Sequence, residues 1–128
     1  MSVEVQNNTP QPTPPVAFDE IKNKVLGSDY ELSLVFVTAE EIQKLNDQYR
    51  KKDYPTDILS FSLTENSGEI FICQTEADAK APLHNKTSEN YMGFLFIHGL
   101  LHLKGLDHGS KMEAEEKALC QFFGIENK

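Results

Sequence analysis

The spacing of apolar residues along the first half of the chain alternates between a period of two and a period near four. Val3 and Val5 alternate with polar neighbours, which predicts a short first strand. Leu32 to Val37 is a compact apolar run with β-branched residues, a pattern typical of a core strand. Two more strands are predicted at 58–63 and 70–73, and they can pair as a hairpin with a loose loop.

Helical spacing marks three segments between or after these strands. The first carries Phe18, Ile21, Val25 and Leu26 and ends at Gly27, the second runs through Ile42, Leu45 and Tyr49, and the third starts at Glu76 and ends at Pro82. Thr38 and Glu41 have the spacing of a capping box, in which each side chain satisfies an exposed backbone amide at a helix start. This box predicts where the second helix begins.

The longest predicted helix runs from about Glu89 to Lys104 and is apolar on nearly every side. A helix of this kind belongs in the centre of a protein. Ser88 can cap its start and Gly105 can end it, and a last amphipathic helix is predicted from Lys111 to Phe123. Strands grouped early, helices grouped late and no visible internal repeat predict an α+β fold with a central buried helix.

A single domain covering residues 1–128 is expected, because a chain of this length has room for one hydrophobic core. Residues 7–16 hold four of the six prolines and are expected to form an extended connector. The hydrophobic fraction of 39% and the charged fraction of 25% argue against wholesale disorder. Cys73 and Cys120 lie far apart among apolar neighbours, so reduced, buried thiols are expected.

Neither a membrane-spanning apolar run nor the basic and apolar stretches of a secretory signal is visible in the sequence. A cytoplasmic location without a membrane partner is therefore expected. The net charge of -8 counts against a nucleic-acid enzyme, because phosphate binding normally draws on Lys and Arg. A local positive site can outweigh that charge, and the lone arginine, Arg50, stands beside Lys51 and Lys52.

Three of the four histidines stand in one string, His98-Gly-Leu-Leu-His102-Leu-Lys-Gly-Leu-Asp-His108. Positions four apart on a helix lie on one face, so His98 and His102 can aim at a common point. Gly105 can adopt the left-handed conformation that turns the chain back and brings His108 towards that point. The alternative is three separate core histidines, which is disfavoured because unpaired imidazoles are costly to bury in an apolar segment.

Three imidazole ligands leave one position of a tetrahedral zinc ion free, which is the arrangement of catalytic zinc sites. Water held there has its pKa lowered to about 7 and becomes a nucleophile at neutral pH. Imidazoles also suit nickel, copper and iron, so a single zinc ion is a preference. Asp107 either hydrogen-bonds one of the histidines or serves as a turn residue. His84 lies in a polar stretch and is expected to be a solvated side chain.

The histidine spacing also matches the zinc-protease pattern His-Glu-x-x-His-x-x-Gly-x-x-His. Gly99 occupies the position of the glutamate, which is the general base of that mechanism. The same metal scaffold must therefore serve other chemistry or take a base from elsewhere, and Glu69 and Asp57 are conceivable substitutes.

Residues 45–61 read LNDQYRKKDYPTDILSF, residues 68–73 read GEIFIC, and the histidine string follows at 98–108. In composition, order and separation these segments resemble the YbeY family of bacterial rRNA maturation factors, which are single-strand-specific, zinc-dependent endoribonucleases. The resemblance spans roughly 32–123. Two departures are Glu69 in place of the family's Asp and Gly109-Ser110 in place of an acidic pair.

The resemblance implies an α+β fold with a small mixed sheet packed against helices. It implies that His98, His102 and His108 bind the metal and that Arg50 is the basic residue of the active-site cleft. A guanidinium can grip two phosphate oxygens and stabilise charge that develops during phosphodiester cleavage. Lys51 and Lys52 either steer RNA towards the cleft or remain solvated surface charges.

The leading hypothesis is an endoribonuclease that acts on precursor rRNA in ribosome maturation and quality control, with ribosomal proteins or the 30S subunit as further partners. A second hypothesis is a metallopeptidase-like hydrolase, against which Gly99 counts. A third is a ribosome assembly factor whose metal is structural, which suits the acidic composition. The sequence leaves the oligomeric state open.

Overall fold

The computed structural model describes residues 3–125; residues 1–2 and 126–128 of the expected domain lie outside the described residues. In chain order the elements are β1 (Glu4–Asn7), α1 (Phe18–Leu26), β2 (Glu31–Phe36), α2 (Ala39–Arg50), β3 (Ile58–Thr64), β4 (Ser67–Ile72), α3 (Gln74–Lys80), the 3-10 helix η1 (Ala81–His84), α4 (Ser88–Leu103) and α5 (Ser110–Phe122). Each strand and helix predicted from the sequence has a counterpart, with ends shifted by a few residues.

A mixed sheet with the strand order β1-β2-β4-β3 organises the described chain. β1 and β4 each pair in parallel with β2, whereas β3 runs antiparallel to β4 at one edge. Parallel neighbours need long crossover connections, and these contain α1 and α2. The α+β fold with a small mixed sheet is therefore confirmed, although two helices are interleaved with the strands that were expected to precede them.

β3 and β4 form the predicted hairpin, but its turn is tight where a loose loop was expected. Thr64 pairs with Ser67 across Glu65 and Asn66. The hydroxyls of Thr64 and Ser67 lie 2.7 Å apart, and the Asn66 amide donates to the Thr64 hydroxyl at 3.1 Å. These polar contacts close the turn, so β4 begins at Ser67, ahead of the apolar run that predicted it.

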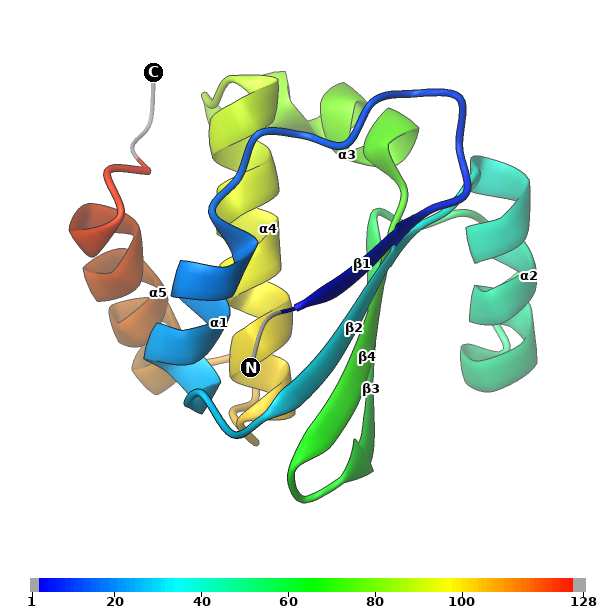
Figure 1. Cartoon of the computed structure of the whole chain (residues 1–128). Coiled ribbons are helices and arrows are strands. Elements are labelled where there is room, and N and C mark those ends of the chain that lie inside the picture. Colours follow the sequence, from blue (N-terminus) through cyan, green and yellow to red (C-terminus); the bar gives the residue numbers. More distant parts are fainter. Residues whose placement is uncertain (1–2, 126–128) are drawn as a thin grey trace.

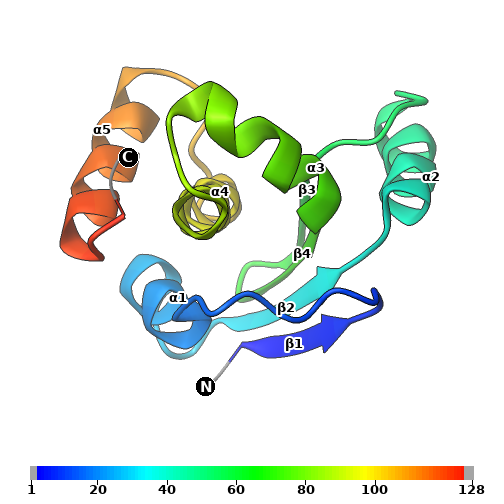
Figure 2. The same cartoon turned by 90° about the horizontal axis from the view of Figure 1, so that it is seen from above.

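The helices form layers on both faces of the sheet (Figure 1). α4 packs against one face with α1 and α5 beside it, while α2 covers the opposite face. Seen from above, α4 is enclosed by α1, α3, α5 and the sheet (Figure 2). Phe96, Ile97, Leu100 and Leu101 on α4 are fully buried, which confirms the prediction of a central buried helix.

Helix starts follow the capping chemistry expected, with one shift. Thr38 accepts a hydrogen bond from the Glu41 amide, and the Glu41 carboxylate accepts one from the Thr38 amide, so the capping box is confirmed. The predicted cap at Ser88 is wrong by one residue. Thr87 is extended and its hydroxyl accepts from the Asn90 amide at 3.1 Å, which leaves Ser88 as the first helical residue.

The remaining expectations concern the connector, the thiols and membranes. Residues 8–17 contain no helix or strand, and the Gln74 amide donates to the Pro12 carbonyl at 3.2 Å, which ties this connector to α3. Cys73 and Cys120 are free and buried, as predicted. Within residues 3–125, no helix has the length and apolar character needed to cross a membrane.

Candidate metal centre

The described structure brings the three histidines of the string to one point. His98 and His102 stand one turn apart on α4, and their Nε2 atoms lie 3.1 Å from each other. His108 follows in the loop before α5 and offers its own ring nitrogen, so that one ligand atom from each of the three residues lies within 4.8 Å of the others. We call these residues the histidine triad.

A helix-ending turn at Gly105 delivers His108 to the triad. Gly105 has a φ of +102°, in the left-handed region where glycine is favoured. Its amide donates to the His102 carbonyl at 3.0 Å, and the Leu106 amide donates to the Leu101 carbonyl at 3.1 Å. This pair of hydrogen bonds is the Schellman motif, which satisfies the last carbonyls of a helix while reversing the chain.

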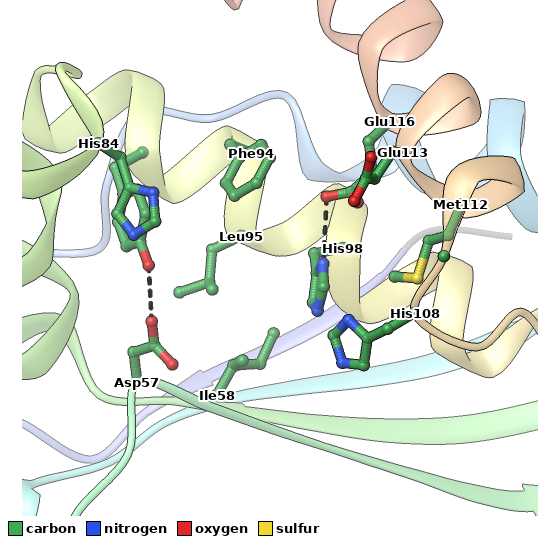
Figure 3. Close-up of a pocket in the computed structure, with 12 residues that line it drawn as sticks. Asp57, Ile58, His84, Phe94, Leu95, His98, His108, Met112, Glu113 and Glu116 are labelled. Atoms are coloured by element: carbon green, nitrogen blue, oxygen red, sulfur yellow. Dashed lines mark hydrogen bonds and ion pairs between the residues drawn. The ribbon is translucent and has the colours of Figure 1, made fainter.

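Glu116 on α5 fixes the orientation of His98. Its carboxylate oxygen lies 3.1 Å from His98 Nδ1, and its side chain is buried (Figure 3). Because an ionised carboxylate only accepts hydrogen bonds, His98 donates from Nδ1 and keeps a lone pair on Nε2, the atom that faces His102. The sequence analysis missed Glu116, although its place between Met112 and Cys120 on the buried face of an amphipathic helix was a usable signal.

Asp107 lies exposed in the turn before His108. Of the two roles considered for it, the structure therefore favours the turn residue, and the carboxylate that contacts a triad histidine belongs to Glu116. Asp107 acts on the triad only as a nearby negative charge that partly offsets the fall in the pKa of His102.

Burial, and then the charges of His98 and His108, lower the pKa of His102 below its ordinary value of 6.5. The ring of His102 is therefore neutral at physiological pH, and a neutral imidazole is the form that binds a metal ion. The triad thus combines one ring oriented by a carboxylate with a second ring held in the neutral state.

Arg50, at the end of α2, lines the same cavity as the triad. It is exposed at the last position of α2 and lines a cavity of about 410 Å³ together with all three triad histidines. Residues of β3, among them Ile58 and Ser60, form the cavity wall between Arg50 and the three histidines. Lys51 and Lys52 are exposed beyond the end of α2 and do not line this cavity. We call the cavity lined by Arg50 and the triad the arginine cavity.

The two carboxylates considered as substitute bases have different positions. Asp57 is buried and lines the arginine cavity, where its Oδ2 accepts a hydrogen bond of 2.8 Å from the Tyr91 hydroxyl. Burial and this hydrogen bond raise the pKa of Tyr91 well above its ordinary value. Lys80 Nζ lies 3.6 Å from the other oxygen of Asp57. Glu69 is on β4 opposite Phe61 and does not line the cavity.

Gly99 packs directly against the sheet. A Cβ atom at this position would lie 2.8 Å from Ile58 Cδ1, 3.0 Å from Ser60 Oγ and 3.2 Å from Ile70 Cδ1. The space that the zinc-protease glutamate would need is therefore filled, so the structure gives a steric reason for the glycine and disfavours the peptidase hypothesis.

His84 is exposed, as expected, but its ring is not simply solvated. It stacks on Tyr91 with centroids 5.1 Å apart and an interplanar angle of 27°. Together with His98 and His108 it lines a second cavity, of about 360 Å³ (Figure 3). We call the cavity lined by His84, His98 and His108 the base cavity.

Comparisons with known proteins give a consistent result. Residues 7–121 match the model of the family described as Endoribonuclease YbeY. A relative of that name from Alkaliphilus metalliredigens is 42% identical over 99 residues, and one from Staphylococcus carnosus is 39% identical over 110 residues, which are 77% of this chain and 71% of the relative. The solution structure of a protein from Thermotoga maritima is similar with a TM-score of 0.66 and 28% identity, over 95% of this chain and 89% of that one.

The match to the Alkaliphilus relative covers 69% of this chain and 64% of the relative. The chain therefore spans less than two thirds of the length of that curated protein.

Proposed function

The chain belongs to the YbeY endoribonuclease family, and from that membership we propose that it is a metal-dependent endoribonuclease that cleaves single-stranded RNA. The observation that carries the proposal is the single cavity that Arg50 and the histidine triad line together. A cation-binding group and an anion-binding group at one opening are what hydrolysis of a phosphodiester requires.

His98, His102 and His108 would hold one zinc ion. Two nitrogens on one tetrahedral zinc, each about 2.0–2.1 Å from it, lie roughly 3.3 Å apart, and the Nε2 atoms of His98 and His102 lie 3.1 Å apart. The donor set is three imidazoles, which leaves a tetrahedral position open. When bound, zinc supplies the Lewis acidity that activates a water molecule at neutral pH.

The protein side chains position the RNA phosphate for attack by the activated water molecule. Arg50 binds the non-bridging oxygens of the phosphate and offsets the charge that develops on them. Glu116 keeps His98 in one tautomer, and Asp57 lies at the cavity wall, where it accepts a hydrogen bond from Tyr91 and forms an ion pair with Lys80. Hydrolysis forms one phosphorus–oxygen bond to water and breaks another in the RNA backbone.

The deciding experiment combines metal content and cleavage of a single-stranded RNA. Arg50→Ala should lose at least about a hundredfold in cleavage rate, because removing one group that stabilises transition-state charge costs on the order of 10²–10³, and its zinc content should equal that of the wild type. His102→Ala should lose both zinc and cleavage. Lys44→Ala is the matched control, because Lys44 is an exposed cation on the same helix that pairs with Glu40 and does not line the arginine cavity.

Cleavage by Arg50→Ala at the wild-type rate would remove Arg50 from the mechanism. Loss of cleavage in Lys44→Ala as well would mean that general surface charge explains the effect.

The substrate in the cell would be precursor rRNA, and the site of action the cytoplasm, during ribosome maturation and quality control. Ribosomal proteins or the 30S subunit are the further partners that we propose. The net charge of -8 supports contacts with basic ribosomal proteins, since opposite charges favour encounter.

The same acidic charge favours a second candidate function, a ribosome assembly factor in which the metal is structural. Chelation distinguishes the two. Removal of a catalytic zinc should abolish cleavage while the far-ultraviolet circular dichroism is retained, whereas removal of a structural zinc should melt the fold. Unfolding at the same chelator concentration that stops cleavage would favour the structural role.

A further inference from the structure

The base cavity lies beside the arginine cavity, on the other side of the triad. Both cavities share four lining residues, Asp57, Ile58, His98 and His108. The base cavity is bounded by η1 and α4 on one side and by the start of α5 on the other, with Asp57 and Ile58 below (Figure 3). Its volume of about 360 Å³ is within the range of small-ligand pockets, roughly 300–1,000 Å³.

The two cavities differ in charge. The arginine cavity contains Arg50, whereas among the described residues no lysine or arginine lines the base cavity. Three carboxylates line the base cavity, those of Asp57, Glu113 and Glu116. Lys80 pairs with Asp57 and Lys86 lies over Phe94, but within residues 3–125 only the arginine cavity has a cationic side chain in its lining, so a phosphate is favoured there over the base cavity. A neutral group with N–H donors suits the base cavity, because ionised carboxylates are pure acceptors.

The rest of the lining is aromatic and apolar. His84, Tyr91 and Phe94 follow one another along one wall, with ring centroids 5.1 Å apart for His84 and Tyr91 and 6.0 Å apart for Tyr91 and Phe94. Leu95 and Met112 add apolar surface. Tyr91 is buried under the stacked His84 ring, so His84 is the aromatic side chain on the solvent side of this wall. Flat apolar surfaces of this type bind planar heterocycles.

We infer that the base cavity binds the nucleobase of the nucleotide next to the phosphate that Arg50 holds. A nucleotide consists of an anionic phosphate and a neutral aromatic base joined by a sugar. The arginine cavity suits the phosphate, and the adjacent aromatic cavity suits the base. This inference rests on the proposed function, since it names the part of the RNA that the site recognises. The His84 ring contacts the face or edge of the base and helps to set which bond is cut.

Asp57 gives the base cavity a preference among bases. Its Oδ2 accepts from Tyr91, and its Oδ1 lies 3.6 Å from Lys80 and 3.5 Å from the Thr56 hydroxyl. A carboxylate has about four acceptor positions, so it can accept one more hydrogen bond from an exocyclic amine. Adenine, guanine and cytosine carry such an amine with two N–H donors, whereas uracil offers only its single ring N–H at N3, so uracil is the least favoured base at this position.

The test is a series of single-stranded RNA oligonucleotides in which one base at a time is removed. With the zinc-loaded wild type, removal of one particular base beside the cut should lower kcat/KM about tenfold or more, which is the size of a stacked base contact. Uracil at that position should also lower kcat/KM, but by a smaller factor than removal of the base. In His84→Ala the penalty for removing that base should largely disappear. Leu83→Ala is the matched control, because Leu83 is 79% exposed in the same 3-10 helix and does not line the cavity.

A penalty of equal size in the wild type and in His84→Ala would overturn the inference, as would the absence of any position at which base removal matters. His84 is exposed at the surface, so its replacement by alanine should leave the fold intact, and a circular dichroism melt checks this.

A second measurement separates this inference from the proposed function. Adenosine 5′-monophosphate, added to the protein, should shift the NMR signals of the His84 and Phe94 rings, and ribose 5-phosphate should not. If the protein cleaves no RNA but adenosine 5′-monophosphate still shifts these signals, the base cavity stands and the nuclease proposal fails. If neither compound shifts them, or an unstructured peptide shifts them and the nucleotide does not, the base cavity is not a nucleobase site.

Discussion

At the scale of single residues, Glu116 has the largest effect on what the histidine triad can bind. Its carboxylate contacts His98 at 3.1 Å across 18 positions of the sequence and is itself buried. A ring whose Nδ1 proton is held in this way presents Nε2 in one fixed direction, which raises its affinity for a metal ion.

Replacing Glu116 by Gln should weaken zinc binding by about 10–100-fold, because a neutral amide accepts a weaker hydrogen bond from His98 and can instead turn its NH2 group towards the ring, which favours the other tautomer. Competition with a chromophoric chelator measures the Kd. Glu115→Gln is the matched control, since Glu115 pairs with Lys104 at 3.3 Å and its replacement should leave the Kd unchanged. An unchanged Kd for Glu116→Gln would show that the hydrogen bond to His98 does not act on the metal.

Gly99 permits a further residue-scale prediction. Gly→Ala in a helix usually stabilises a protein by up to about 1 kcal/mol, but here the new Cβ meets Ile58 at 2.8 Å and Ser60 at 3.0 Å. Gly99→Ala should therefore lower the free energy of unfolding by about 1–3 kcal/mol, the cost of overpacking a core. Urea denaturation measures it.

Gly93→Ala on the same helix serves as the comparison. The three nearest atoms to its new Cβ all belong to the side chain of Ile125, which lies at the end of the described chain and can move aside. The loss should be smaller than for Gly99→Ala. An equal or larger loss at Gly93 would contradict the conclusion that Gly99 packs against the sheet without room for a side chain.

Some site residues could be predicted from the sequence and others could not. Spacing alone placed His98 and His102 on one helix face, and the glycine after them predicted that His108 returns to the same point. The contacts of Glu116 with His98 and of Tyr91 with Asp57 join residues 18 and 34 positions apart on different elements. Such contacts depend on how helices and strands pack together, which no local pattern encodes.

At the scale of elements, the start of α4 is defined by one hydroxyl. The Thr87 side chain accepts from the Asn90 amide, whereas Ser88 already belongs to the helix. Thr87→Ala should lower the free energy of unfolding by about 1 kcal/mol, which is typical for loss of an N-cap. Ser88→Ala should have an effect close to zero.

Urea denaturation of both variants checks this prediction about the start of α4. The sequence offered two adjacent hydroxyl residues and gave no means of choosing between them, because both can cap a helix. A larger loss of unfolding free energy for Ser88→Ala than for Thr87→Ala would mean that Ser88 caps α4, as the sequence predicted.

The sequence predicted the strands but not their order in the sheet. Hydrophobic periodicity marked β2, β3 and β4, because burial of one or both faces requires it. Periodicity does not show which strands pair. The connection through α2 leads from β2 to β3 at the edge of the sheet, and the tight hairpin after β3 then places β4 between β3 and β2. The capping box of α2 was predictable in full, since all of its contacts fall within four consecutive residues.

At the scale of the whole molecule, the core contains several weak acids that fold in their neutral form. Burial raises the pKa of Tyr30, Cys73 and Tyr91, and raises that of Cys120 from its ordinary 9.0 to about 11. Each of these groups loses its proton more readily in the unfolded chain than in the folded protein. The unfolded state therefore gains free energy of ionisation at alkaline pH that the folded state does not.

The contribution of these groups to stability should be constant below about pH 9, and stability should decrease as the pH rises from there towards 11, because in this window the unfolded chain releases protons that the folded protein retains. Chemical denaturation at a series of pH values measures the slope. Cys120→Ala removes one of the groups whose titration differs between the two states, so its stability should decrease less steeply than that of the wild type between about pH 9 and 11. If the two slopes are equal, the Cys120 thiol is not held neutral by the fold, and the alkaline loss must come from Cys73, from the tyrosines or from lysines losing their charge.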